Sequence, residues 1–190
     1  MDERDLPGEL AVELDGSFER LVLLYQDRLY AFVLGLSGVP QDAEEIVADT
    51  FVRAYRALVR YPAERIQALA LRPWLYRIAL NTFRNRVRGR RLPLVPLDEI
   101  GEHTDLACEP DATGQPDQVG ERGELREKLA LLIAALPERY RVAVVLRHIQ
   151  GCEYGEIATL LGQPIGTVKA NVHRGLRRLR DGLRAYSEWR

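Results

Sequence analysis

The sequence predicts an all-α fold: two small helical domains joined by a flexible acidic linker, with a helix-turn-helix in the C-terminal domain. Apolar residues recur every three or four positions along most of the chain, and no segment alternates apolar and polar residues convincingly as a strand does. Residues 92–122 break the helical pattern with four prolines, three glycines and many acids. Such a composition buries too little apolar surface to fold by itself. The predicted order is an acidic N-terminal segment (1–16), a helical domain (17–91), the linker (92–122) and a second helical domain (123–185).

Three helices are expected in the first domain. The first follows an apolar series that begins at Phe18. The second starts where Asp42 and Glu45 have the spacing of a capping box. It ends before Pro62, because the residue before a proline disfavours helical dihedrals. A helical turn fits residues 63–70, and a third helix follows it.

A basic surface is expected on the third helix. From Arg72 to Arg91 there are seven arginines and no acidic residue. Aromatic and amide side chains lie among them, a mixture that suits phosphate contact and base stacking on partly single-stranded DNA. Two of the aromatic residues, Trp74 and Phe83, fit the hydrophobic core equally well.

The second helix carries an acidic strip. Glu45 and Asp49 are like charges four residues apart, which mildly opposes helix formation. A docking strip for a basic protein partner explains this placement. An ordinary solvated face, in which Asp49 pairs with Arg53, explains it as well.

Residues 153–184 give the most specific signal. A short helix with Ile157 and Leu161 on its inner side is followed by Gly162, the residue type that most cheaply adopts the left-handed conformation ending a helix. The inward positions of the next helix are Ile165, Val168, Val172, Leu176, Leu179 and Leu183. Its outward positions include Lys169, Ala170, His173, Arg174, Arg177 and Arg178. This pattern predicts a helix-turn-helix whose second helix enters the DNA major groove, although a helical hairpin with a solvated arginine face has the same spacing.

The residue inventory excludes several classes of function. Cys108 and Cys152 form no CxxC motif and the chain has three histidines, so neither a metal site nor a disulfide framework is expected. No apolar run reaches about 18 residues, so the protein is expected to be cytoplasmic and without membrane contact of its own. His103, His148 and His173 accompany no nucleophile motif, and no glycine-rich phosphate loop is present. We therefore expect a protein that is not an enzyme and needs no cofactor.

Four runs together resemble the extracytoplasmic-function (ECF) group of the sigma-70 family, the exchangeable promoter-specificity subunits of bacterial RNA polymerase. They are DAEEIVADTFVRAYRAL at 42–58, PWLYRIALNTFRNRVRGRR at 73–91, LPERYRVAVVLRHIQGCEYGEIATLLG at 136–162 and PIGTVKANVHRGLRRLR at 164–180. The resemblance leaves out only the first residues and the linker. It implies binding to core polymerase, recognition of the −10 and −35 promoter elements, and promotion of DNA melting.

The resemblance also implies roles for individual residues and partners. The residues that would dock on the clamp coiled coil of the largest polymerase subunit are Glu45, Asp49, Phe51 and Arg53. Those that would line the −10 surface are Arg77, Asn81, Arg84, Asn85 and Arg88. Those that would face the −35 element or its phosphates are Lys169, Ala170, His173, Arg174, Arg177 and Arg178. The segment before Trp74 would capture a flipped −10 base, the linker would thread toward the RNA exit channel, the polymerase flap would be a further contact, and an anti-sigma factor would clamp both domains.

Two departures limit this transfer, and one alternative remains. Asn171 stands where relatives commonly carry arginine, and residues 62–72 differ from the family forms, so neither the −35 contacts nor the −10 preference carries over directly. A stand-alone helix-turn-helix regulator explains the C-terminal domain but leaves the acidic strip and the arginine-rich helix without a role.

Overall fold

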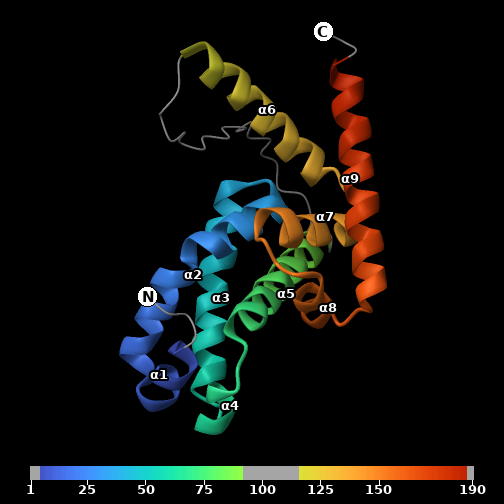
Figure 1. The fold of residues 1–190 in the computed structure, drawn as a ribbon. Helices are drawn as coiled ribbons and strands as arrows, with labels where there is room; N and C mark the ends of the chain where they lie inside the picture. Colours follow the sequence, from blue (N-terminus) through green and yellow to red (C-terminus); the bar gives the residue numbers. More distant parts are fainter. Residues whose placement is uncertain (1–4, 92–115, 188–190) are drawn as a thin grey trace.

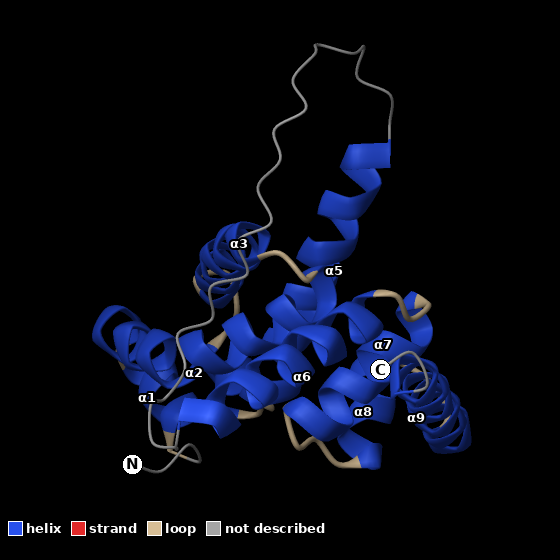
Figure 2. Ribbon diagram, turned by 90° about the horizontal axis from the view of Figure 1, so that it is seen from above, coloured by secondary structure: helices blue, strands red, loops and turns tan. Residues whose placement is uncertain are grey.

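The computed structural model describes residues 5–91 and 116–187, and within them every regular element is helical, which confirms the all-α prediction (Figures 1 and 2). The N-terminal unit contains α1 (Leu6–Val12), α2 (Leu14–Ser37), α3 (Pro40–Leu58), α4 (Ala63–Gln67) and α5 (Leu71–Arg91). The C-terminal unit contains α6 (Pro116–Ala134), α7 (Glu138–Val144), the π-helical turn η1 (Val145–Ile149), α8 (Tyr154–Leu161) and α9 (Ile165–Ser187).

Helices α2, α3 and α5 pack together as the bundle of the N-terminal unit. The capping box expected at Asp42 and Glu45 is wrong, because α3 begins two residues earlier at Pro40 and has no side-chain cap. Proline fixes the φ angle that the first helical turn needs, so the helix starts there without a cap. Asp42 therefore lies inside the first turn, where its Oδ1 is 3.4 Å from Nε of Arg86 on α5.

The N-terminal segment (1–16), which the sequence predicted only as acidic, contains helix α1. Leu6 and Leu10 of α1 are fully buried, and α1 packs against both α2 and α4. Helix α4 itself agrees with the helical turn expected at residues 63–70. Figure 1 shows α1 and α4 at the same end of the bundle.

In the C-terminal unit, α8 and α9 form the expected helix-turn-helix. Gly162 ends α8 in the left-handed conformation with φ of 63°. Ile165, expected to face inward, is 48% exposed because it opens α9 before the helix reaches the core. Asn171, on the other hand, is buried, and its Nδ2 lies 3.5 Å from Oε1 of Gln163.

Helix α6 starts at Pro116, inside the segment expected as linker (92–122). Proline suits the first position of a helix, because its fixed φ matches helical dihedrals and its missing N–H would have no intrahelical partner there, so the helix can begin at Pro116. Residues 92–115, with His103 and Cys108, lie outside the described residues.

The close packing of α7 on α9 depends on Gly175. A Cβ atom at this position would lie 2.5 Å from Cγ2 of Val144 and 3.4 Å from the backbone oxygen of Tyr140. We expect Gly175→Ala to lower the free energy of unfolding by about 1–3 kcal/mol, the usual cost of overpacking. Gly166→Ala on the same helix is the control: it meets nothing within 4 Å and should stabilise by about 0.5–1 kcal/mol. Equal urea midpoints for the two variants would contradict this packing.

Candidate functional site

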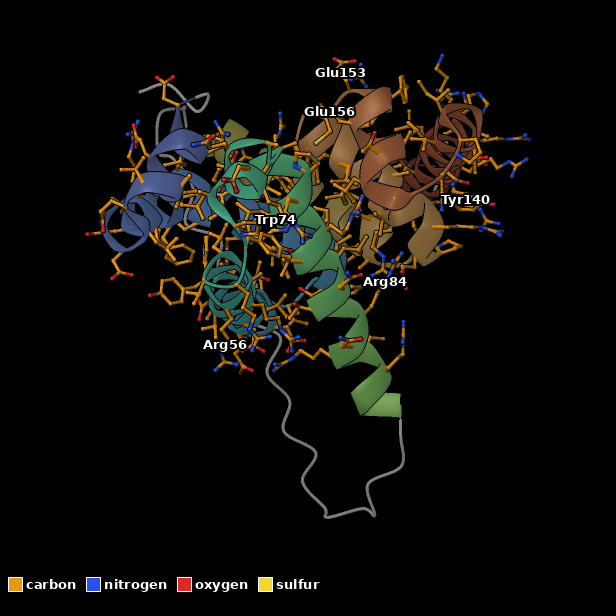
Figure 3. All side chains as sticks on the ribbon, turned by 90° about the horizontal axis from the view of Figure 1, so that it is seen from below. Arg56, Trp74, Arg84, Tyr140, Glu153 and Glu156 are labelled. Atoms are coloured by element: carbon orange, nitrogen blue, oxygen red, sulfur yellow. The ribbon has the colours of Figure 1, made fainter. Side chains whose placement is uncertain are left out.

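The predicted −10 residues share one face of α5, and they differ in their partners. Asn81, Asn85 and Arg88 are exposed. Arg77 instead reaches α8, where it donates from Nε to the Leu160 oxygen at 3.2 Å and from its terminal nitrogen to the Thr159 oxygen at 2.5 Å. Arg84 donates from Nε to Oε1 of Glu138 at 2.7 Å, and Figure 3 shows it on the side of α5 that faces the C-terminal helices.

Arginines of each unit donate hydrogen bonds to backbone carbonyls at helix ends of the other unit. The last carbonyls of a helix lack intrahelical donors and carry partial negative charge, so a cation there is favourable. Arg77 serves this role at the end of α8. Arg72 donates to the Gln150 carbonyl just after η1, and Arg141 of α7 donates to the Leu36 carbonyl in the last turn of α2. The contact between the units is therefore polar and directional as well as apolar.

Tyr76 lies at the centre of this contact. Its side chain is fully buried, its ring packs edge to face on Phe32 at 4.9 Å between centroids, and its hydroxyl is 2.6 Å from the side-chain amide of Gln150. Burial raises the pKa of Tyr76 from 10.0 to about 12, against the opposing effect of the Arg72 charge.

This raised pKa predicts how stability depends on pH. The folded state prefers the neutral phenol, so its contribution is complete below pH 10 and is lost as the pH rises through 12. The loss is on the order of 2–3 kcal/mol for a shift of this size. We expect urea unfolding measured from pH 8 to 11.5 to show a steeper loss for the unaltered protein than for Tyr76→Phe. Parallel curves would show that Tyr76 titrates normally.

One of the two acids in the acidic strip of α3 already forms an ion pair within the protein. Glu45 forms an ion pair with Arg86 of α5, so it has a structural partner that the sequence pattern does not reveal. Asp49 and Arg53 are exposed, and among the described residues the ion pair that a solvated face would allow between them is not formed. Phe51 is 9% exposed and packs edge to face on Phe18, so most of its ring lies in the core.

A shallow apolar groove of about 320 Å³ lies beside this strip between α2 and α3. Phe18, Val52 and Tyr55 line it together with Phe51 and Arg56. The sequence feature that points to the groove is its pair of aromatic residues, Phe18 and Tyr55, although helical spacing predicts core positions for both.

The predicted −35 residues lie together on α9. Lys169, His173, Arg174, Arg177 and Arg178 are exposed, and Ala170 is half-buried. Nζ of Lys169 lies 5.7 Å from the ring centroid of Tyr154 at the start of α8. Arg147 lies 4.7 Å from the same ring and pairs with Glu153 at 3.2 Å. Tyr154 and Arg147 therefore extend this surface, although the sequence pattern did not single them out.

A second cationic group surrounds Tyr140 of α7 (Figure 3). The guanidinium carbons of Arg139 and Arg178 lie 4.7 and 5.6 Å from its ring centroid. Burial raises the pKa of the Tyr140 phenol, but hydrogen bonds and charges from Arg139 and Arg174 outweigh this and lower the pKa below its usual value. Within the described residues these three arginines form no ion pair with an acid. Arg139 is thus a candidate anion-binding residue that sequence reasoning missed.

Metal sites, reactive thiols and membrane-spanning helices are not found in the part of the chain that the structure describes. Residues 5–91 and 116–187 contain no His, Cys, Asp and Glu group suited to hold a metal ion. Cys152 is a buried free thiol whose pKa is raised by burial, which disfavours the reactive thiolate. No helix among these residues has the length and apolar character needed to span a membrane.

Comparison with protein families matches both helical units. Residues 21–92 match the family model described as Sigma-70 region 2. Residues 126–179 match the model described as Sigma-70, region 4.

Curated proteins similar to this chain include two sigma factors. The ECF RNA polymerase sigma factor SigE of Mycolicibacterium smegmatis is 36% identical over 172 residues, which cover 90% of this chain and 63% of that protein. The chain thus spans less than two thirds of that relative's length. The RNA polymerase sigma-H factor of Pseudomonas aeruginosa is 34% identical over 164 residues, covering 83% of this chain and 81% of that protein.

Two solved structures have a similar fold. One is the structure of CnrH in complex with the cytosolic domain of CnrY, with a TM-score of 0.66, 25% identity, and coverage of 96% of this chain and 97% of that chain. The other contains the sigma factor RpoE in complex with the anti-sigma factor NepR from Bartonella quintana, with a TM-score of 0.63, 24% identity, and coverage of 88% and 96%.

Proposed function

Since the chain belongs to the ECF group of the sigma-70 family, we propose that it binds core RNA polymerase, recognises the −10 and −35 elements of particular promoters and promotes DNA melting. The observation that carries this proposal is the pairing of two different cationic helix faces in one chain. One is the outer face of α9 in the helix-turn-helix, and the other is the arginine and amide face of α5. Duplex reading and strand opening need different surfaces of these two kinds.

The proposal assigns a task to each surface. Residues 17–91 act as region 2 and residues 123–185 as region 4. On α9, Lys169, Ala170, His173 and Arg174 face the −35 bases, and Arg177 and Arg178 face its phosphates. The cluster at Tyr140 supports this assignment, because Arg139 adds a further cation next to Arg174 and Arg178. On α5, Arg77, Asn81, Arg84, Asn85 and Arg88 face the opened −10 segment.

Two of the proposed −10 residues already form hydrogen bonds to the C-terminal unit. Arg77 and Arg84 donate to α8 and α7, so both contacts must break before these arginines reach DNA. We therefore propose that the two units separate when the protein binds polymerase and promoter. An anti-sigma factor that holds the units together would block this step, and the polymerase clamp and flap are the proposed contacts of the separated units.

Asp49 gives the cleanest test of polymerase binding, because it is exposed and free of the ion pair that holds Glu45. We expect Asp49→Lys to weaken binding to core polymerase at least about tenfold (1.4 kcal/mol). Its melting temperature should change little, because exposed substitutions usually cost under about 0.5 kcal/mol. Asp27→Lys, exposed on α2, is the matched control. Equal affinities of both variants and the unaltered protein would refute the proposed docking strip, and no core binding at all would favour a stand-alone DNA-binding regulator.

A further inference from the structure

Helix α1 lies outside the residues that match the region 2 family model, which begins at residue 21. It is nevertheless an integral part of the N-terminal unit. Leu6 and Leu10 are 0% and 1% exposed, and their helix packs on α4 and on α2. Helix α1 therefore bears on the two elements that it packs against, α4 and α2.

Helix α4 needs outside support. It has five residues, and so short a helix has little stability of its own in water. It buries one large apolar side chain, Ile66, which is 5% exposed, and the helix that it packs against most extensively is α1. Because α4 occupies the connection between α3 and α5, the position of this connection depends on α1.

Several contacts fix α1 on the bundle. The Glu13 carboxylate accepts hydrogen bonds at 3.1 and 3.0 Å from the backbone N–H of Gly16, so one residue ends α1 and caps α2. Glu9 of α1 forms an ion pair with Arg20 of α2. Asp15, in the first turn of α2, accepts a hydrogen bond of 2.7 Å from the Tyr55 hydroxyl of α3, so it fixes the start of α2 to α3. Glu9 and Glu13 therefore hold α1 in one orientation relative to α2, and Asp15 holds the start of α2 on α3.

The connection between α3 and α5, which α1 supports in this way, is flanked by two partly exposed aromatic residues, Tyr61 and Trp74. Arg65 of α4 places its guanidinium carbon 3.7 Å from the ring centroid of Tyr61. The Tyr61 ring in turn lies 6.4 Å from that of Trp74 on α5, at an interplanar angle of 56°. Arginine and aromatic faces are the groups on which unpaired bases stack.

We propose that α1 is a positioning element for base recognition: Leu6 and Leu10 hold α4 so that Arg65, Tyr61 and Trp74 form a preformed surface for an unpaired base. This inference rests on the proposed function, since promoter melting supplies the base. A surface ordered in advance avoids the cost of ordering these side chains when DNA binds. The positioning residues are Leu6 and Leu10, and Glu9 helps to orient them through Arg20.

The test compares Leu6→Ala/Leu10→Ala with Leu29→Ala, a fully buried leucine of α2. Amide hydrogen exchange is measured in the full chain. Holoenzyme made with core polymerase is then used to select bound templates from a library randomised at the −10 and −35 segments. In the α1 variant we expect exchange at residues 63–69 to rise at least about tenfold and exchange in the middle of α3 to change less than about twofold. Base preference should weaken at −10 and persist at −35, and Leu29→Ala should not show this selectivity.

Two further variants keep the test decisive. Glu9→Gln loosens the tie to α2 without creating a cavity, so it should give a smaller effect of the same kind even if the double variant fails to fold. Leu10→Met, which conserves volume, should retain the −10 preference. Unchanged exchange at residues 63–69, or faster exchange with an unchanged −10 preference, would overturn the inference. If the unaltered holoenzyme selects no −10 sequence, the proposed function fails, and the exchange result still decides whether α1 holds α4.

Discussion

Gly35→Leu is expected to separate the two helical units and to increase affinity for single-stranded DNA about tenfold. A Cβ atom at Gly35 would already lie 3.1 and 3.2 Å from the two methyl carbons of Val145, so the larger leucine side chain cannot fit between α2 and η1. Separation frees Arg77 and Arg84 from α8 and α7. Apparent affinity rises in proportion to the fraction of molecules in the binding-competent state. Fluorescence anisotropy with a labelled oligonucleotide measures the affinity, and small-angle scattering measures the separation.

The control for this variant is Gly123→Leu, on α6, where an added Cβ meets nothing within 4 Å. Glu138→Gln is a milder companion: it weakens the hold on Arg84 and leaves every proposed DNA-contacting residue in place. It should raise affinity less than Gly35→Leu. An expanded Gly35→Leu protein that binds DNA no better than the unaltered chain would show that the contact between the units does not occlude a DNA-binding surface.

Lys169→Ala and Arg84→Ala/Arg88→Ala are expected to fail at different steps of initiation. Lys169 lies on the exposed face of the recognition helix, and removing a good base-reading side chain costs about 1–3 kcal/mol at the matching site. This variant should therefore bind duplex DNA more weakly at first and show a relaxed −35 preference. Arg84 and Arg88 lie on α5, so their joint replacement should reduce open complexes more than initial binding. The salt dependence of binding should fall by roughly 0.7–0.9 in slope for each phosphate that the variant no longer neutralises.

A premelted template separates the two defects. It should partly rescue the Arg84/Arg88 variant, because the cost of unpairing has been removed, and it should not rescue Lys169→Ala. Arg126→Ala, an exposed arginine on α6, removes a comparable charge away from both surfaces and is the control. Equal rescue of both variants, or of neither, would contradict the division of labour between α5 and α9.

Local patterns were sufficient to predict most of the helices, although not α1 or the start of α6, and the exposed face of α9. Gly162 has the left-handed φ that its place after Leu161 predicts, and the cationic residues from Lys169 to Arg178 are exposed as their spacing predicts. Periodicity records which side of a helix is apolar, so it predicts such faces well.

Features that depend on contacts distant in sequence were missed. The Glu45 and Asp49 spacing gave no sign that Arg86, 41 residues later, pairs with Glu45. Arg77 and Arg84 have the sequence pattern of free cations because their partners, Thr159 and Glu138, lie in the other unit. The capping box at Asp42 failed because Pro40 provides a competing helix start.

Transcription from a promoter library by core RNA polymerase, with and without this protein, tests the central claim most directly. The account predicts that core polymerase alone gives no promoter-specific transcripts. Addition of the protein should produce transcripts from templates that share one −10 and one −35 sequence, and Lys169→Ala should lose the −35 selection. Specific binding of the protein to library DNA in the absence of polymerase, with no transcripts when polymerase is added, would contradict the account.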